Sequence, residues 1–449
     1  MKNRRDWPGA PQSIYIADSF DGAISLKCAV QKPDRYSFFG AGTTTHCAIA
    51  RGAGLSYAAA SFGGDAISVD MSSFDRVLAF CDKTGIVEVE AGIRLGDLYN
   101  FLIRRNFYLP IQPGHGRISI GGCIAADVHG KNPFRDGTFA KQVQSVKLFH
   151  PDHGIVNLSE TAQPALFRAT CGGYGTTGII ISAQLRCVRV PGNAVEVHIE
   201  KVASVNEGVL RLRSLAHDSD FVYSWHDLTL PSAQFGRGHV VVARFVNVPI
   251  TRPSQLYIPQ LLPNSRERWP VGVYTFWTAR AINAAHAATR GRNTKHVTLD
   301  QSLFPIHGSE HYFSAFGKKG FHEFQAIVPH DSFGEYIAGI RAATAYHSVT
   351  ITLAAAKIFA GTSTLIRFDG DGVCFTINFP RSQRSPEFMH SLDQLLLEVG
   401  GRPNPIKDSR LPRHIAEAAY PELPHLRSVL HSWDKSRMFR SELSVRLGL

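Results

Sequence analysis

Three glycine-rich loops in the first 190 residues are the part of the sequence best suited to binding an anion. They lie at residues 51–57 (RGAGLSY), 113–122 (PGHGRISIGG) and 172–178 (GGYGTTG). Because glycine has no side chain, the backbone can approach a ligand closely and N–H groups can converge on one negative charge. A single loop of this kind is more often a tight turn. Three loops separated by strands favour a cofactor cradle, in which the first two would hold a pyrophosphate together.

The third loop contains the pattern G-x-G-x-x-G at residues 173–178. In a Rossmann dinucleotide site this pattern follows a strand and opens a helix. Here a helix-like segment at 163–170 precedes the glycines, and the apolar run Ile179-Ile180-Ile181 follows them. The order is reversed, so the sequence argues against a nicotinamide-binding Rossmann site.

Short strands and helices must position these loops. Runs of apolar residues predict the strands, apolar spacing of three and four predicts one helix, and Pro151-Asp152-His153-Gly154 predicts a hairpin turn. Pro164 suits the first turn of a second helix. The predicted strands are 46–50, 67–70, 86–90, 143–149, 154–158 and 179–186, and the predicted helices are 95–102 and 163–170.

The length of 449 residues exceeds that of one ordinary hydrophobic core, so two domains are expected. From about residue 192 the segments become longer and richer in aromatic residues, which is typical of a second domain lining a roomy pocket. From about residue 402 the sequence is again polar and basic with helical apolar spacing.

The composition restricts the class of protein and its partners. Hydrophobic residues make up 44% and charged residues 19%, as in globular proteins, and no apolar run is long enough for a transmembrane helix. The N-terminal segment, MKNRRDWPGAPQS, lacks the apolar region of a secretory signal. The net charge of +11 favours anionic partners. Since that charge is scattered, nucleic acid is the weaker choice, and a phosphate-bearing substrate or a membrane surface fits at least as well.

The seven cysteines are odd in number and widely spaced, with no C-x-x-C pair. Free thiols in a reducing compartment are the simplest interpretation, and we expect no metal site because no Cys/His cluster has zinc-ligand spacing. His307 and His311 are four residues apart but lack an H-E-x-x-H context, so they are interpreted as loop histidines.

Residues 51–57 resemble the pyrophosphate loop of the vanillyl-alcohol-oxidase/PCMH flavoprotein superfamily, and Pro113-Gly114 with residues 120–125 (IGGCIA) resembles its second FAD-binding stretch. The resemblance implies FAD as the cofactor. The cofactor-binding residues that it implies are Arg51, Gly52, Ala53, Gly54, Leu55, Ser56, Tyr57, Pro113, Gly114, Ser119, Gly121, Gly122, Ala125, His129, Asn132, Gly178, Ile179 and Asn404.

Within that superfamily the chain is similar, nearly end to end, to the decaprenylphosphoryl-ribose 2′-oxidases. The similarity is carried by residues 129–132 (HGKN), 172–175 (GGYG), 400–410 (GGRPNPIKDSR) and 439–441 (FRS). It implies an α+β fold in two domains: an FAD-binding domain of residues 1–191 and 402–449, and an inserted substrate-binding domain of residues 192–401 on an antiparallel sheet.

The same resemblance implies an activity and its partners. The enzyme would be an FAD-dependent oxidoreductase acting on CH-OH groups, oxidising the C2′ hydroxyl of a polyprenylphosphoryl-β-D-ribose to a 2′-keto sugar. This is the first half of an epimerisation that makes an arabinose donor for cell-wall arabinan. A separate NAD(P)H-dependent reductase would complete the epimerisation. With these partners and no spanning helix, we expect a cytoplasmic protein loosely held at the inner membrane surface.

Site residues carry over position by position. Lys407 and Lys131 match the catalytic positions, His129 matches one near the flavin, and Gln325 and Lys357 match positions lining the sugar-phosphate pocket. A lysine is a compact cation for a phosphate, and it accepts a proton if its pKa is lowered. Each lysine alone would be interpreted as a solvated surface group, but the motifs around these lysines favour their assignment to the site. Either Lys407 or Lys131 could be the base.

Four positions depart from the family pattern. Thr376 stands where the family has cysteine, Asn404 where it has tyrosine, and Glu323 where it has glutamine, so the substrate pocket is altered in its lipid or sugar contacts. Leu55 occupies the position where many superfamily members carry a histidine bonded covalently to the flavin. Leucine has no nucleophile, so non-covalent FAD is expected.

Two alternatives of different kinds remain beside this prediction. One is an FAD-dependent oxidase or dehydrogenase of a soluble sugar or aldonolactone on the same fold, which would turn over water-soluble lactones. The other is a flavin-free structural or anion-binding protein, which would be colourless because bound oxidised flavin is yellow.

Overall fold

The computed structural model describes residues 13–40, 46–231, 234–249, 256–257, 266–289 and 294–449. The basic segment 1–12, which holds most of the stretch read as lacking a secretory signal, lies outside these ranges. Strands and helices both contribute substantially, and most strand pairs are antiparallel, so the predicted α+β class is confirmed. All seven cysteines are free. Within the described ranges, no helix is long and apolar enough to span a bilayer.

Two sheets and a short ribbon carry the glycine loops. The four-stranded sheet has the order β1-β2-β4-β3, and its strands are β1 (Ser13–Asp18), β2 (Ser25–Gln31), β4 (Ala66–Asp70) and β3 (Cys47–Arg51). The antiparallel five-stranded sheet has the order β5 (Val77–Cys81), β6 (Ile86–Glu90), β10 (Ile179–Arg186), β8 (Val143–His150) and β9 (Gly154–Leu158). The ribbon pairs β7 (Phe107–Tyr108) with β11 (Val188–Arg189).

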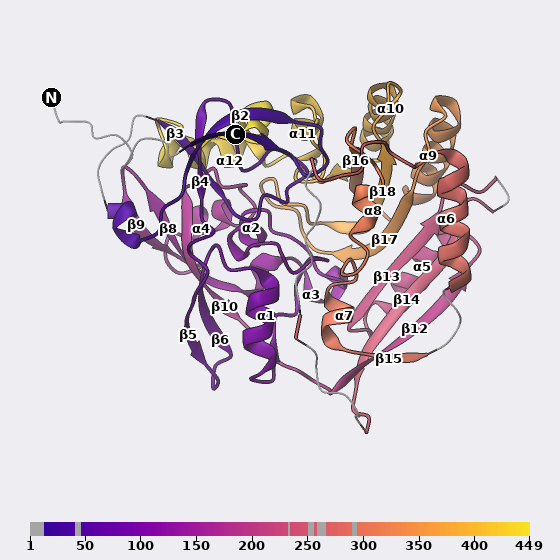
Figure 1. Ribbon diagram of the computed structural model, residues 1–449, viewed down its shortest axis with the longest axis horizontal. Coiled ribbons are helices and arrows are strands. Elements are labelled where there is room, and N and C mark those ends of the chain that lie inside the picture. The colour runs from indigo at the N-terminus through magenta and orange to yellow at the C-terminus, as the bar shows by residue number, and fades with distance from the viewer. Residues whose placement is uncertain (1–12, 41–45, 232–233, 250–255, 258–265, 290–293) are drawn as a thin grey trace.

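An antiparallel eight-stranded sheet forms the other side of the molecule (Figure 1). Its strands in spatial order are β15 (Lys295–Val297), β12 (Ala194–Val202), β14 (Arg237–Val246), β13 (Phe221–Asp227), β17 (Leu353–Ala360), β18 (Asp371–Pro380), β16 (Phe321–Val328) and β19 (Arg402–Pro403).

Helices connect and cover these sheets. In chain order the α-helices are α1 (Leu95–Ile103), α2 (Ile120–Ala125), α3 (Pro133–Asp136), α4 (Pro164–Thr170), α5 (Val205–Leu215), α6 (Phe276–Thr289), α7 (Leu299–Leu303), α8 (His311–Ser314), α9 (Phe333–His347), α10 (Ser385–Glu398), α11 (Arg413–Ala419), α12 (Leu423–Trp433) and α13 (Glu442–Leu447). Two 3-10 helices are η1 (Tyr36–Gly40) and η2 (Phe139–Gln142).

The two faces of the eight-stranded sheet differ because side chains alternate along a strand. Phe324, Ala326, Ala356 and Ile358 pack into one apolar core with residues of α5, α9 and α10. On α9 the buried residues Phe333, Tyr336, Ile337 and Ile340 recur at helical spacing, so one stripe of the helix covers this face. The intervening residues of the same strands point to the opposite face. That face is therefore available for a site.

The segments following residue 402 return to the N-terminal part of the chain. Ala48 of β3 donates its N–H to the Met438 carbonyl at 2.8 Å and accepts from the Arg440 N–H at 3.0 Å. Glu442 and Leu443 donate to the carbonyls of Phe62 and Ala59. Residues 438–443 thus complete the structure that surrounds the first glycine loop.

Candidate active site

A cavity of about 400 Å³ lies between the glycine loops and the face of the eight-stranded sheet opposite α5, α9 and α10. This volume is within the range of small-molecule sites. All but five of the site residues predicted from the sequence line it. The five that do not are Arg51, Asn132, Ile179, Glu323 and Thr376.

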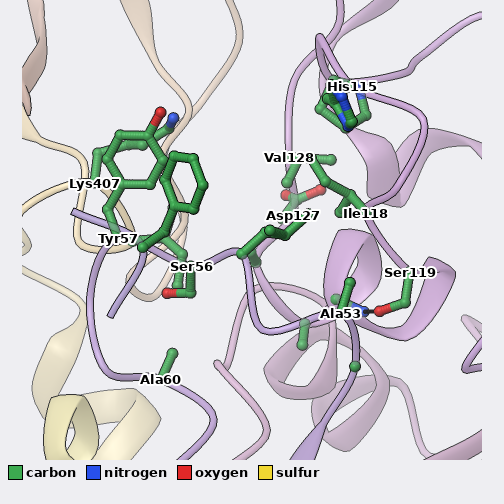
Figure 2. A pocket seen from close by; sticks show the side chains of 18 of the residues that line it. Ala53, Ser56, Tyr57, Ala60, His115, Ile118, Ser119, Asp127, Val128 and Lys407 are labelled. Atoms are coloured by element: carbon green, nitrogen blue, oxygen red, sulfur yellow. Dashed lines mark hydrogen bonds between the residues drawn. The ribbon is translucent and has the colours of Figure 1, made fainter. Parts of the chain in front are cut away.

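The first two glycine loops meet at Gly52 and Ser119. A Cβ atom at Gly52 would lie 2.0 Å from the Ser119 hydroxyl oxygen, so no side chain fits at this position without movement. That hydroxyl accepts a hydrogen bond from the Gly122 N–H at 3.3 Å and caps α2, as Figure 2 shows beside Ala53. The contact brings the N-terminus of α2 against the loop at 51–57.

The free N–H groups of the first loop fit the pyrophosphate of FAD. Among the described residues, none accepts a hydrogen bond from the backbone N–H groups of residues 52–57. These residues line the cavity. Several free donors beside glycines that bring the backbone close form a cradle for a doubly charged group. The residues present therefore fit the cofactor that the resemblance implies.

Three predicted cofactor residues lie outside the cavity lining. The Arg51 guanidinium turns beneath the loop, donates to the Ser61 hydroxyl at 3.0 Å and lies over the Phe62 ring. The Asn132 side-chain amide donates to the carbonyls of Ala216 and Ser219. Ile179 is fully buried in an apolar core. These contacts hold the loops and strands in place around the cavity.

Three lysines and one histidine face the cavity together. Lys357 is on β17, opposite in direction to Ala356 and Ile358, and its Nζ lies 3.0 Å from the Gly130 carbonyl oxygen and 3.3 Å from His129 Nδ1. Lys131 is buried, and its Nζ donates to the Gln112 carbonyl at 3.3 Å. Within the described part of the chain, neither lysine pairs with a carboxylate.

Burial shifts the proton affinities of this cluster. It lowers the pKa of the Lys357 ammonium to about 8. Burial, reinforced by the charge of Lys357, holds the pKa of Lys131 and that of His129 well below their ordinary values. The buried members of the cluster therefore bind a proton less readily than free side chains do, whereas Lys357, with a pKa of about 8, is mostly protonated at neutral pH.

Lys407 also lines the cavity, where it lies beside the Tyr57 ring (Figure 2). Its Nζ is 3.7 Å from the ring centroid and 3.1 Å from Glu323 Oε1. Tyr57 is buried against Phe20 and Phe321, and burial raises the pKa of its phenol well above the ordinary value. The aromatic ring and the carboxylate together fix the position of this ammonium group.

The positions that depart from the family pattern form connected contacts. Gln325 donates to the Thr376 hydroxyl at 2.7 Å, and the Asn404 side-chain amide donates to the Gln325 side-chain oxygen. Glu323 also accepts a hydrogen bond from Asn378 at 3.0 Å. Gln325 is opposite Thr376 in the pairing of β16 with β18, so register alone brings them together. Thr376 and Glu323 support the lining residues from behind.

Sequence reasoning missed several residues of the cavity wall. His115 lies within the predicted second loop, but it was not assigned to the site. Its Nδ1 accepts from the Arg117 N–H at 3.2 Å, so Nε2 carries the proton and faces Glu310 at 3.4 Å. Phe20, Tyr223 and Phe313 come from distant segments, and nothing in their local sequence marks them as site residues.

A family model described as "FAD binding domain" matches residues 27–159. A Mycolicibacterium smegmatis protein named decaprenylphosphoryl-beta-D-ribose oxidase is 26% identical over 420 residues, which covers 89% of this chain and 89% of that protein. The mitochondrial D-lactate dehydrogenase [cytochrome] 1 of Saccharomyces cerevisiae is 32% identical over 130 residues, or 28% of this chain and 22% of that protein. The L-gulonolactone oxidase of Mus musculus is 29% identical over 124 residues, or 28% of each chain.

The two kinds of match carry different information. The long match extends through both the glycine loops and the eight-stranded sheet, whereas the short matches cover little more than a quarter of the chain. The predicted resemblance is confirmed, and so is FAD as the cofactor. The protein is an FAD-dependent oxidoreductase that acts on CH-OH groups.

Proposed function

We propose that this FAD-dependent oxidoreductase oxidises the C2′ hydroxyl of a polyprenylphosphoryl-β-D-ribose to the 2′-keto sugar. The observation that carries the proposal is the half-buried Lys357 ammonium on the cavity wall, whose partners among the described residues are a carbonyl oxygen and an imidazole nitrogen. A buried cation without a carboxylate partner is costly, and a bound phosphate diester would supply the missing negative charge.

The three lysines of the cavity would have different roles in this reaction. FAD held by the glycine loops would supply the hydride acceptor. Lys357 would hold the phosphate, while Lys407, fixed by Tyr57 and Glu323, would hold the sugar hydroxyls against the flavin. Lys131, whose pKa is lowered by burial, would take the hydroxyl proton. Such placement accounts for a large part of catalysis in two-reactant steps.

A two-domain arrangement would serve this reaction. We propose an FAD-binding domain of residues 1–191 and 402–449 and a substrate-binding domain of residues 192–401. The family match within residues 27–159 supports the first, and the eight-stranded sheet with its helices supports the second. The short strand β19 at the return point pairs with β16, so the segment that carries Lys407 is bonded to the large sheet.

The product needs a second enzyme. A 2′-keto sugar is converted to the arabinose epimer by hydride addition, so a separate NAD(P)H-dependent reductase would act next. The altered positions Thr376, Glu323 and Asn404 lie at or directly behind the cavity wall, which is compatible with a lipid or sugar different from that of the Mycolicibacterium protein.

Anaerobic flavin reduction tests the proposal. Purified protein is mixed with a polyprenylphosphoryl ribose, with the corresponding free ribose, and with a panel of soluble sugars and aldonolactones, and bleaching of the flavin absorbance is followed. The lipid-phosphate ribose should reduce the flavin with the highest second-order rate constant. Faster reduction by a soluble lactone or free sugar would instead assign the protein to the soluble-substrate oxidases.

The position of Leu55 predicts how FAD is attached. Leu55 lines the cavity within the first loop and carries no nucleophilic atom, so no covalent bond to the flavin can form there. Acid precipitation of the purified yellow protein should therefore release the flavin to the supernatant, where its absorbance is measured. Yellow colour that stays with the washed pellet would show a covalent bond elsewhere.

A further inference from the structure

Residues 269–277 expose an unusual concentration of large apolar side chains. Val271 is 75% exposed and Trp277 is 73% exposed, and Trp269, Val273 and Phe276 are also exposed. The rings of Phe276 and Trp277 lie 5.2 Å apart at the start of α6. Scattered exposed apolar residues are normal, but a cluster with two tryptophans within one short segment indicates a surface that contacts something else.

The backbone of this segment is held firmly, so the exposed side chains are presented in a fixed arrangement. The Val273 N–H donates to the Ala315 carbonyl at 2.9 Å, and the Trp269 N–H donates to the Ser314 carbonyl at 3.3 Å. Tyr274 points inward and packs against Phe316 with ring centroids 4.6 Å apart. The residues on either side of Tyr274 therefore face outward.

Two lysines border the apolar cluster. Lys318 and Lys319 are exposed and directly follow Gly317. A Cβ atom at Gly317 would lie 2.3 Å from the Gly272 nitrogen and 2.6 Å from the Val271 carbonyl carbon, so the two backbones touch. The lysines therefore sit next to Val271. Tryptophan and apolar side chains bordered by lysines are the composition that binds the interface of an anionic bilayer.

The cluster and the cavity lie on two sides of the same short segment. Residues 311–317, which bond to the exposed segment through Ser314 and Ala315, also contribute Phe313 to the cavity wall. Phe313 and Phe316 pack against Phe321 in the aromatic group that supports Tyr57. A substrate with a long lipid could therefore reach the cavity from the surface on which this cluster lies.

We infer that Trp269, Val271, Phe276 and Trp277, with Lys318 and Lys319, form a docking surface for an anionic lipid bilayer. If a second copy of the chain docked on the same surface, the lysines of the two copies would lie close together and repel each other. The chain also carries a net charge of +11, which adds to this repulsion. A bilayer rich in anionic headgroups meets both the apolar residues and the charge. The biological role of this surface rests on the proposed lipid substrate, but vesicle binding can be measured whether or not that substrate is correct.

Vesicle flotation without substrate tests the inference on the FAD-bound protein. The vesicles contain phosphatidylcholine alone or phosphatidylcholine with phosphatidylglycerol, at low and high salt. The parent should float with the anionic vesicles at low salt. The double substitution Val271→Ser/Trp277→Ser should lower the bound fraction about 10-fold or more, and Lys318→Gln/Lys319→Gln should lower it about 10-fold on the anionic vesicles alone.

The controls separate this inference from the proposed function. Leu210→Ser and Tyr346→Ser replace exposed apolar residues on α5 and α9 and should leave flotation unchanged. Val271→Ser/Trp277→Ser should still reduce its flavin at the parent rate with substrate dispersed in detergent. The inference is overturned if the parent protein does not bind anionic vesicles, or if Val271→Ser/Trp277→Ser binds them as well as the parent does. It is also overturned if the parent is a dimer that Val271→Ser/Trp277→Ser makes monomeric.

Discussion

Replacing Lys407 with alanine is expected to slow reduction of the bound flavin by about 10²- to 10³-fold at saturating substrate. The Lys407 ammonium is fixed between the Tyr57 ring, at 3.7 Å, and Glu323, at 3.1 Å. It can therefore hold the sugar hydroxyls and stabilise the negative charge that the flavin would gain with the hydride, and removal of one such fixed donor has effects on this scale. Stopped-flow absorbance under anaerobic conditions measures the rate directly.

Two further variants make the Lys407 result specific. Lys147→Ala removes a surface lysine that pairs with Glu88 on the five-stranded sheet, and it should leave the rate unchanged. Glu323→Gln keeps the ammonium group but removes the carboxylate that positions it, and it should give an intermediate rate. If Lys407→Ala folds, holds its flavin and reduces it at the parent rate, Lys407 does not act on the substrate.

The rate constant kcat/KM for a phosphate-diester substrate is expected to fall as the pH rises through about 8. Burial lowers the pKa of Lys357 to about 8, so above this pH the free enzyme loses the cation proposed to bind the phosphate. A phosphate diester does not titrate between pH 6 and 10, so the break belongs to the enzyme. Lys357→Gln should remove the break and lower kcat/KM below pH 8 by about 10-fold or more.

The matched control is Lys357→Arg, whose guanidinium stays charged throughout and should also abolish the break. Stability gives an independent check. The pKa of Lys357 is lowered from 10.5 to about 8 in the folded protein, so between these two pH values the unfolded chain binds more protons than the folded one. The contribution of Lys357 to the free energy of unfolding therefore increases as the pH rises through this range. A break at pH 8 that persists in Lys357→Gln would assign it to another group.

Local sequence patterns predicted the elements around the glycine loops well. The strands at 86–90, 154–158 and 179–186 have the predicted bounds, and α4 begins at Pro164 as expected. Helix α4 precedes and β10 follows the glycines at 173–178, which confirms the rejection of a Rossmann site. These predictions succeeded because apolar periodicity, proline and glycine act within a few residues of one another.

The assembly of the cavity could not be predicted in the same way. Tyr223 and Phe313 reach it only through the register of β13 and the packing of α8, which depend on contacts between distant segments. The sequence placed Arg51 in the anion-binding loop, but its guanidinium is engaged by Ser61 and two aromatic rings. Nor did the sequence indicate that Glu323 would pair with Lys407. Side-chain direction and pairing depend on the finished fold.

The bonds between Ala48 and residues 438–440 have a consequence for biosynthesis. A nascent chain emerges from its N-terminus, so the first glycine loop leaves the ribosome long before the segment that encloses it. Until residues 438–443 follow, Ala48, Ala59 and Phe62 lack the partners that fix the loop between them. We therefore expect flavin to bind only after synthesis of the chain is nearly complete, and a protein truncated before residue 438 should be colourless.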